Sequence, residues 1–181
     1  MDHIDKMCNK ANSTLGFLRR NLSNCPKQLK ELSYIALVRS KLEYAACVWN
    51  PYLAKDIKKI EAVQRRSARF VTRNYSWTQS VTELLSELGW ETLEKRRSNA
   101  SLTMMFKIIN NEVAININEH LERSTSSTRK EHSHQFRHIS TNTDAYKNSF
   151  FPRTLKVWNK LSSDIVNSTS CDQFKSLITN L

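Results

Sequence analysis

Glycine and proline are scarce in this sequence, with two and three residues among 181. Gly16 and Gly89 stand far apart, so the chain cannot form a phosphate-cradling loop of the G-x-G-x-x-G or G-x-x-x-x-G-K-[ST] type. No Asn-Gly or Asp-Gly pair occurs, which disfavours tight two-residue β-hairpins. These absences exclude the common nucleotide-binding loops and favour helices over strands.

The sequence also lacks a long apolar run and a targeting segment. No stretch approaches the roughly 18 consecutive apolar residues of a membrane-spanning helix. The first residues match neither a secretory signal nor a transit peptide. The four cysteines, which include no C-x-x-C pair, favour reduced thiols over a disulfide framework. We therefore expect an intracellular protein of the nucleus or cytoplasm that is neither secreted nor bound to a membrane.

No pattern of a known catalytic site is present. The sequence has no adjacent aspartates, no H-E-x-x-H and no G-x-S-x-G. His132, His134 and His138 have some likeness to metal ligands. A zinc site, however, needs a second pair of ligands, and these histidines lie in a Ser/Thr-rich stretch. We expect no catalytic residue, no bound metal and no cofactor.

The charge is strongly positive and uneven. Lys and Arg number 28 against 17 Asp and Glu, which gives a net charge of +11 and an isoelectric point of about 9.7. Residues 1–99 hold 18 of these cations and 10 of the acids. An excess of this size indicates an anionic partner such as nucleic acid, and it assigns the contact to the first half of the chain.

Apolar residues recur at helical spacing over most of the chain. This predicts an all-α protein, an irregular bundle of six or seven helices. Boundary signals support the pattern: Pro26 suits a first helical position, Pro51 follows a helix end, and Ser80 with Glu83 forms a capping box. The predicted helices span residues 5–20, 27–48, 54–73, 80–88, 92–110, about 150–161 and 170–179.

Residues 122–143 differ from the rest in composition. Nine of the 20 residues from 124 to 143 are Ser or Thr, and few are apolar. This composition predicts a long flexible loop or linker. It divides the chain into a basic helical region over residues 1–121, the loop over 122–143 and a C-terminal helical segment over 144–181.

The predicted helix over residues 54–73 has an informative charge pattern. At about 100° per residue its apolar positions fall on one side, and a row of cations falls on the other. Residues 55–73 contain seven cations and two acids, too few acids for i,i+4 pairing to neutralise the row. Since the arginine fork binds phosphate, we predict a nucleic-acid-binding face; a merely solvated face is the alternative. The candidate residues are Lys58, Arg65, Arg66, Arg69 and Arg73, with Arg19, Arg20, Arg96 and Arg97 as possible extensions.

An ordered series of short motifs runs along nearly the whole chain. Its first part is Met7-Cys8, Lys10-Ala11-Asn12, Leu15-Gly16-Phe17-Leu18-Arg19-Arg20-Asn21-Leu22, Leu37-Val38-Arg39, Leu42-Glu43-Tyr44-Ala45 and Val48-Trp49-Asn50-Pro51. Its second part is Ile60-Glu61, Val63-Gln64-Arg65-Arg66, Ala68-Arg69-Phe70, Leu88-Gly89-Trp90, Leu93, Arg96-Arg97, Ser149-Phe150-Phe151-Pro152, Trp158-Asn159 and Leu161. The series resembles the thumb and post-thumb region of reverse transcriptases from non-LTR (LINE-type, jockey-like) retrotransposons. The family often has proline where this chain has Ser162.

The resemblance implies a C-terminal fragment of an RNA-directed DNA polymerase of a mobile element. The aspartate pair that binds the catalytic metals in the palm of such enzymes has no counterpart here, so the chain on its own is not expected to be an enzyme. A thumb supports catalysis by holding the template–primer duplex or RNA. The alternative is a helical protein-interaction module with no nucleic-acid role, or a fragment that folds only beside the missing palm. The oligomeric state stays open.

Overall fold

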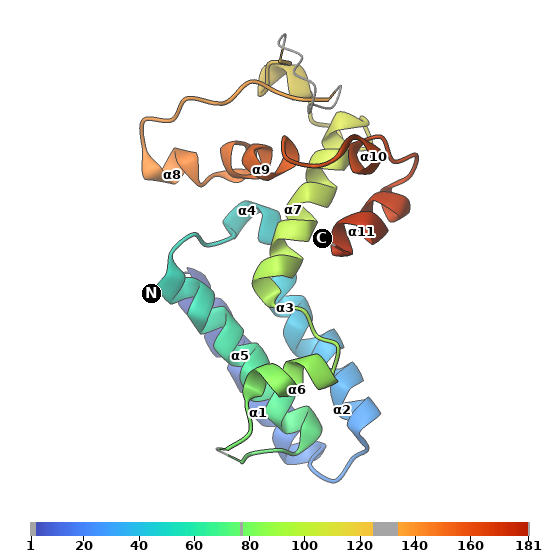
Figure 1. The fold of residues 1–181 in the computed structure, drawn as a ribbon. Coiled ribbons are helices and arrows are strands. Elements are labelled where there is room, and N and C mark those ends of the chain that lie inside the picture. Colours follow the sequence, from blue (N-terminus) through green and yellow to red (C-terminus); the bar gives the residue numbers. More distant parts are fainter. Residues whose placement is uncertain (1–2, 77, 125–133, 181) are drawn as a thin grey trace. The chain divides into compact units, whose positions relative to one another are not determined.

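A computed structural model describes residues 3–76, 78–124 and 134–180 (Figure 1). Over these residues the chain is mostly helical and has no β-strand, apart from one isolated bridge between Arg123 and Phe136. The all-α prediction is confirmed, with more short helices than the six or seven expected. The chain divides into two compact units, Met1–Arg96 and Arg97–Leu181, each with its own apolar core. This division falls inside a helix and differs from the predicted boundaries at 121 and 144.

The first unit contains the long helices that were predicted most closely. The helices predicted at 5–20, 54–73, 80–88 and 92–110 occur within two residues of the predicted ends. Their apolar faces surround a core that includes Leu18, Tyr34, Val38, Ile60 and Phe70. The elements are α1 (His3–Asn21), α2 (Lys27–Tyr34), η1 (Ile35–Arg39), α3 (Ser40–Glu43), α4 (Ala46–Trp49), α5 (Ala54–Thr72), α6 (Val81–Glu87) and the beginning of α7 (Leu93–Ile109).

Helices α1 and α5 lie side by side and run in the same direction (Figure 1). Lys59 Nζ is 2.7 Å from Asp5 Oδ1, and Arg66 Nη1 is 3.0 Å from Asn12 Oδ1. Both pairs have the same sequence offset of 54 residues, which requires a parallel arrangement. On each helix the paired residues are seven positions apart, the repeat of a coiled-coil seam. We refer to this row of pairs as the α1–α5 seam.

The single helix predicted over residues 27–48 is interrupted. After α2 the chain forms the π-helical turn η1, and α3 ends at Glu43. Ala45 then adopts a left-handed φ of 51° before α4 begins. Trp49 Nε1 donates a hydrogen bond to the Tyr44 carbonyl at 2.7 Å, so the indole satisfies an acceptor that the break leaves outside the helix. The prediction of one continuous helix is therefore wrong at residues 44–45.

The second unit is built around the later part of α7. Phe106 stacks on Phe174 with ring centroids 4.5 Å apart, and Trp158 is completely buried beside them. The helices predicted to begin near 150 and 170 are both present. The remaining elements of this unit are η2 (Ile117–Glu119), α8 (Asp144–Lys147), α9 (Phe150–Trp158), α10 (Ser163–Val166) and α11 (Cys171–Thr179).

The described ends of the stretch predicted as a flexible loop are docked on the second core. Phe136 is buried, and the Asn159 side chain forms two hydrogen bonds with its backbone. Asn159 Nδ2 donates to the Phe136 carbonyl at 2.8 Å, and Asn159 Oδ1 accepts from the Phe136 amide at 3.3 Å. Trp158 Nε1 donates to the His134 carbonyl at 3.0 Å. Residues 125–133 of the predicted loop lie outside the described residues. The polar composition of this stretch gave no indication that one of its residues, Phe136, packs into the core.

Replacing Asn159 with alanine is expected to loosen this docked segment. Two partly buried backbone groups of Phe136 would lose their partner, at a cost of about 1–3 kcal/mol. Amide hydrogen exchange measured on peptides covering residues 134–140 should become faster. Asn167, which is exposed at the end of α10, offers the matched control, and Asn167→Ala should leave the exchange unchanged. Equal exchange in both variants would contradict the role given to Asn159.

Candidate nucleic-acid interface

The outer face of α5 carries cations that have no acidic partner. Lys58 and Arg65 are exposed, and within the described ranges neither forms an ion pair with a carboxylate. They lie two helical turns apart, roughly 10 Å along the axis. The face is open because Ile60, Val63 and Ala68 turn the other side of α5 into the core. These two cations therefore present their full charge to solvent.

The cations of the α1–α5 seam are partly engaged. Lys59 lies 2.7 Å from Asp5 and 3.5 Å from Asp56, and its hydrogen bond lowers the pKa of the Asp5 carboxyl. Arg66 is exposed and hydrogen-bonds Asn12, a neutral acceptor. Since an amide oxygen does not compensate a guanidinium charge, the charge of Arg66 stays uncompensated, whereas the charge of Lys59 is compensated by Asp5 and Asp56.

Arg69 and Arg73 differ from the row predicted for them. Arg69 is half-buried and donates to the Ser76 carbonyl at 3.3 Å. Helix α5 ends at Thr72, and Arg73 is its C-cap with a left-handed φ of 56°. The helical alignment of Arg65, Arg69 and Arg73 is thus broken at its last member. Arg73 instead points its Nη2 to the backbone carbonyl of Ser23 and the side chain of Asn24.

Two of the predicted cations differ from the rest, because Arg96 is half-exposed and paired with an acid and Arg97 is buried. Arg96 forms an ion pair with Glu43, and this hydrogen bond raises the pKa of the guanidinium. Arg97 is buried, with 1% of its surface exposed. Adjacent residues on a helix point about 100° apart, which is why Arg97 can be buried although its neighbour Arg96 is half-exposed. The prediction that Arg97 extends the cationic face is therefore wrong, and Arg96 is already neutralised.

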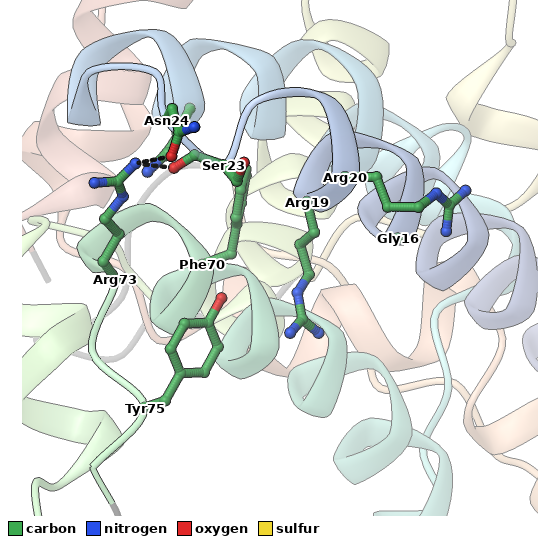
Figure 2. A pocket seen from close by; sticks show the side chains of 9 residues that line it. Gly16, Arg19, Arg20, Ser23, Asn24, Phe70, Arg73 and Tyr75 are labelled. Carbon is green, nitrogen blue, oxygen red and sulfur yellow. Dashed lines mark hydrogen bonds between the residues drawn. The ribbon is translucent and has the colours of Figure 1, made fainter.

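Arg19 and Arg20 line a pocket of about 710 Å³ at the C-terminal ends of α1 and α5 (Figure 2). The guanidinium of Arg19 lies over the ring of Tyr75, 5.4 Å from its centroid. Arg73 lies on the opposite side, bonded to Ser23 and Asn24. The lining residues are Gly16, Arg19, Arg20, Ser23, Asn24, Lys30, Phe70, Arg73 and Tyr75.

Lys30 is a buried member of this pocket that sequence reasoning missed. It is 1% exposed, and its ammonium lies 5.6 Å from the centroid of the Phe70 ring. Burial, followed by the nearby charge of Arg73, lowers the pKa of Lys30. One signal was available: Lys30 precedes Tyr34 and Val38 by four and eight residues, so it occupies a core-facing position of its helix.

A second cationic recess, of about 390 Å³, follows the first half of α1. Lys6 and Lys10 of α1 and Lys41 of α3 converge there, and Lys41 Nζ donates to Thr14 Oγ1 at 2.6 Å. This recess was not predictable before the fold was known, because none of these lysines belongs to a basic run. The lining residues are His3, Lys6, Met7, Lys10, Lys41 and Tyr44.

Comparisons with known proteins give no relative for this arrangement. No family model, no curated protein and no solved structure matches this chain. Within the described parts, no helix is long and apolar enough to cross a membrane. No group of three or more His, Cys, Asp or Glu side chains in those parts is placed to hold a metal ion. All four cysteines are described, and none is in a disulfide.

Proposed function

We propose that the first unit holds nucleic acid by its phosphate backbone, as the thumb and post-thumb region of a LINE-type reverse transcriptase would. The observation that carries the proposal is the uncompensated charge of Lys58 and Arg65 on the outer face of α5. Arg66 and Arg69, both without a carboxylate partner in the described chain, border this face. Electrostatic contact of this kind tracks the backbone and is independent of sequence.

In this role the chain would support a polymerase reaction by binding the nucleic acid and would carry out no chemical step itself. The first unit would supply a rigid cationic helix, since α5 is fixed by the α1–α5 seam and by a buried contact with α2. That contact is the hydrogen bond from the Tyr34 hydroxyl to Gln64 Oε1 at 3.2 Å. Gln64 Nε2 in turn donates to the Glu91 carbonyl at 2.8 Å. A fixed helix holds its cations at a constant spacing for phosphate contacts at a low entropic cost.

The test is the double variant Lys58→Gln/Arg65→Gln, with duplex binding measured at several salt concentrations. If each residue contacts one phosphate, the slope of log K against log salt should flatten by roughly 0.9 per contact, thus by about two units. Binding should weaken equally for all sequences, on both DNA and RNA–DNA duplexes. Helicity should not change, because glutamine has a helix propensity close to that of lysine and arginine.

The matched control is Lys27→Gln/Lys175→Gln, which removes the same amount of charge. Both lysines are exposed and paired with acids, Lys27 with Glu87 at 2.6 Å and Lys175 with Asp172 at 3.0 Å. This control should keep the wild-type slope. If the two double variants behave alike, net charge and not the α5 face governs binding. If neither variant changes the slope, the proposal fails.

A protein-interaction module remains the second candidate, and one observation favours it. Leu29, Leu32 and Leu37 are 43%, 63% and 47% exposed along α2 and η1. Exposed leucines at helical spacing are typical of a surface that docks a partner helix. Binding of a protein partner by this apolar row should be insensitive to salt. It should be lost on Leu32→Glu and kept by the Lys58→Gln/Arg65→Gln variant.

A further inference from the structure

The α1–α5 seam ends after its second pair, where α5 itself ends. In both pairs a cation of α5 faces an acceptor of α1: Lys59 faces Asp5, and Arg66 faces Asn12. The same offset of 54 residues would match Arg73 with Arg19, but α5 ends at Thr72 and Arg73 turns to Ser23 and Asn24. Arg19 and Arg73 both line the pocket at this end of the seam.

Positive charge accumulates in this pocket without compensation. Four of the nine lining residues are cations, and none is acidic. The helix dipole accounts for cations at the C-terminal ends of α1 and α5, where Arg19, Arg20 and Arg73 lie. It does not account for Lys30, which is the fourth residue of α2 and therefore near the positive end of that helix.

Lys30 is the second, independent observation that points to a ligand. Its side chain is buried and lines the pocket, and among the described residues its ammonium has no hydrogen bond and no carboxylate partner. Its ammonium lies 5.6 Å from the centroid of the Phe70 ring, a cation–π contact that stabilises the charge. A buried charge normally has a partner, because desolvation without one is costly. An anion in the pocket would supply that partner.

We propose that this pocket binds a phosphate group, with Lys30, Arg19 and Arg73 as its ligands. Arg73 uses Nη2 for Ser23 and Asn24, which leaves Nη1 and Nε as donors. Arg19 is held against Tyr75 with its guanidinium edge available. Several cations converging from three helices match a dianionic phosphate better than a single carboxylate, and arginine forks bind it bidentately. The site is separate from the outer face of α5 and does not depend on the proposed function.

Two sources share this chemistry: free inorganic phosphate, and the terminal phosphate of a nucleic-acid strand. Binding of inorganic phosphate to the full chain is measured by calorimetry at constant ionic strength. Lys30→Met keeps the length of the side chain and removes the charge, and we expect at least tenfold weaker binding. Lys175→Met is the matched control: Lys175 is exposed, is paired with Asp172 and belongs to neither proposed site, so this variant should bind phosphate as the wild type does.

The source is decided with a single-stranded oligonucleotide carrying either a 5′-phosphate or a 5′-hydroxyl. Tighter binding of the phosphorylated strand, lost in Lys30→Met, assigns the pocket to a strand end. Equal binding of both strands, together with phosphate binding, assigns it to free phosphate.

Should Lys30→Met fail to fold by circular dichroism, the exposed Arg19→Gln variant replaces it, with an expected loss of several-fold. Absence of phosphate binding to the wild type at millimolar concentration overturns the proposal. Phosphate binding that is unchanged in both Lys30→Met and Arg19→Gln also overturns the proposal. Loss of duplex binding in Lys58→Gln/Arg65→Gln leaves the pocket untouched, so the two proposals fail separately.

Discussion

Trp158→Ala is expected to destabilise the second unit by about 3–5 kcal/mol, the usual cost of deleting a fully buried large aromatic side chain. Trp158 has no exposed surface, and its ring lies 5.8 Å from that of Phe174. Its Nε1 also holds the His134 carbonyl at 3.0 Å. The substitution therefore leaves a cavity between α9 and α11 and releases the segment that contains Phe136.

Chemical denaturation of the full chain, followed by exchange of unit-specific amides, checks this result. Val157 precedes Trp158 in α9 and is 41% exposed, so Val157→Ala is the matched control, with a loss below about 1 kcal/mol. Trp158→Phe should fall between the two because it keeps part of the packing and loses the hydrogen bond. A Trp158→Ala variant as stable as Val157→Ala would show that α9 does not organise this core.

Tyr34→Ala is expected to have a similar effect on the first unit, about 3–5 kcal/mol. Tyr34 is fully buried and stacks on Trp90 with ring centroids 4.3 Å apart. Its hydroxyl donates to Gln64, so the substitution also leaves a buried amide oxygen unpaired. Thermal unfolding of the full chain measures the loss. Ser33→Ala, on the neighbouring residue, should have a much smaller effect.

Tyr34→Phe separates the hydroxyl from the ring and adds a pH dependence. Burial raises the pKa of the Tyr34 phenol, so the folded state keeps its proton where the unfolded state, with a pKa near 10, releases it. Above about pH 10 this group makes wild-type stability fall by up to about 1.4 kcal/mol per pH unit. The phenylalanine variant lacks that contribution. It should be about 1 kcal/mol less stable at pH 8, and the difference should shrink from pH 10 upward.

The fold was predictable wherever local periodicity and burial agree. Helices α1, α5, α6 and α7 follow from apolar spacing and from start signals such as Ser80, whose Oγ accepts from the Thr82 amide at 3.2 Å. The break at Ala45 was not predictable, since the residues from 42 to 49 keep a helical apolar pattern. A single side chain, the Trp49 indole, supports that break through a contact that periodicity does not describe.

The candidate site was predictable only in part, for a related reason. A helical wheel shows how residues are oriented about the axis of one helix, and this is enough to predict that Lys58 and Arg65 lie on the outer face of α5. It does not show which neighbouring helix covers Arg97, nor that Glu43 lies within reach of Arg96. The pocket required four cations from α1, α2 and the end of α5 to meet, and one of these, Lys30, belongs to no basic run. Such convergence depends on tertiary contacts between residues far apart in the sequence, such as Arg19 and Tyr75, which are 56 positions apart.

The parallel arrangement of α1 and α5 also affects how the first unit can form. Neighbouring antiparallel helices can pair as soon as a short turn is made, but α1 has its partner 54 residues later in the chain. At a synthesis rate of about 5–20 residues per second, the side of α1 that packs on α5 lacks this partner for about 3–10 s, until α5 has been synthesised. Closing so long a loop also slows folding relative to an up-and-down bundle. During that interval α1 can pack against α2, η1 and α3, which it also contacts and which are made first, so only the side of α1 that α5 covers stays exposed.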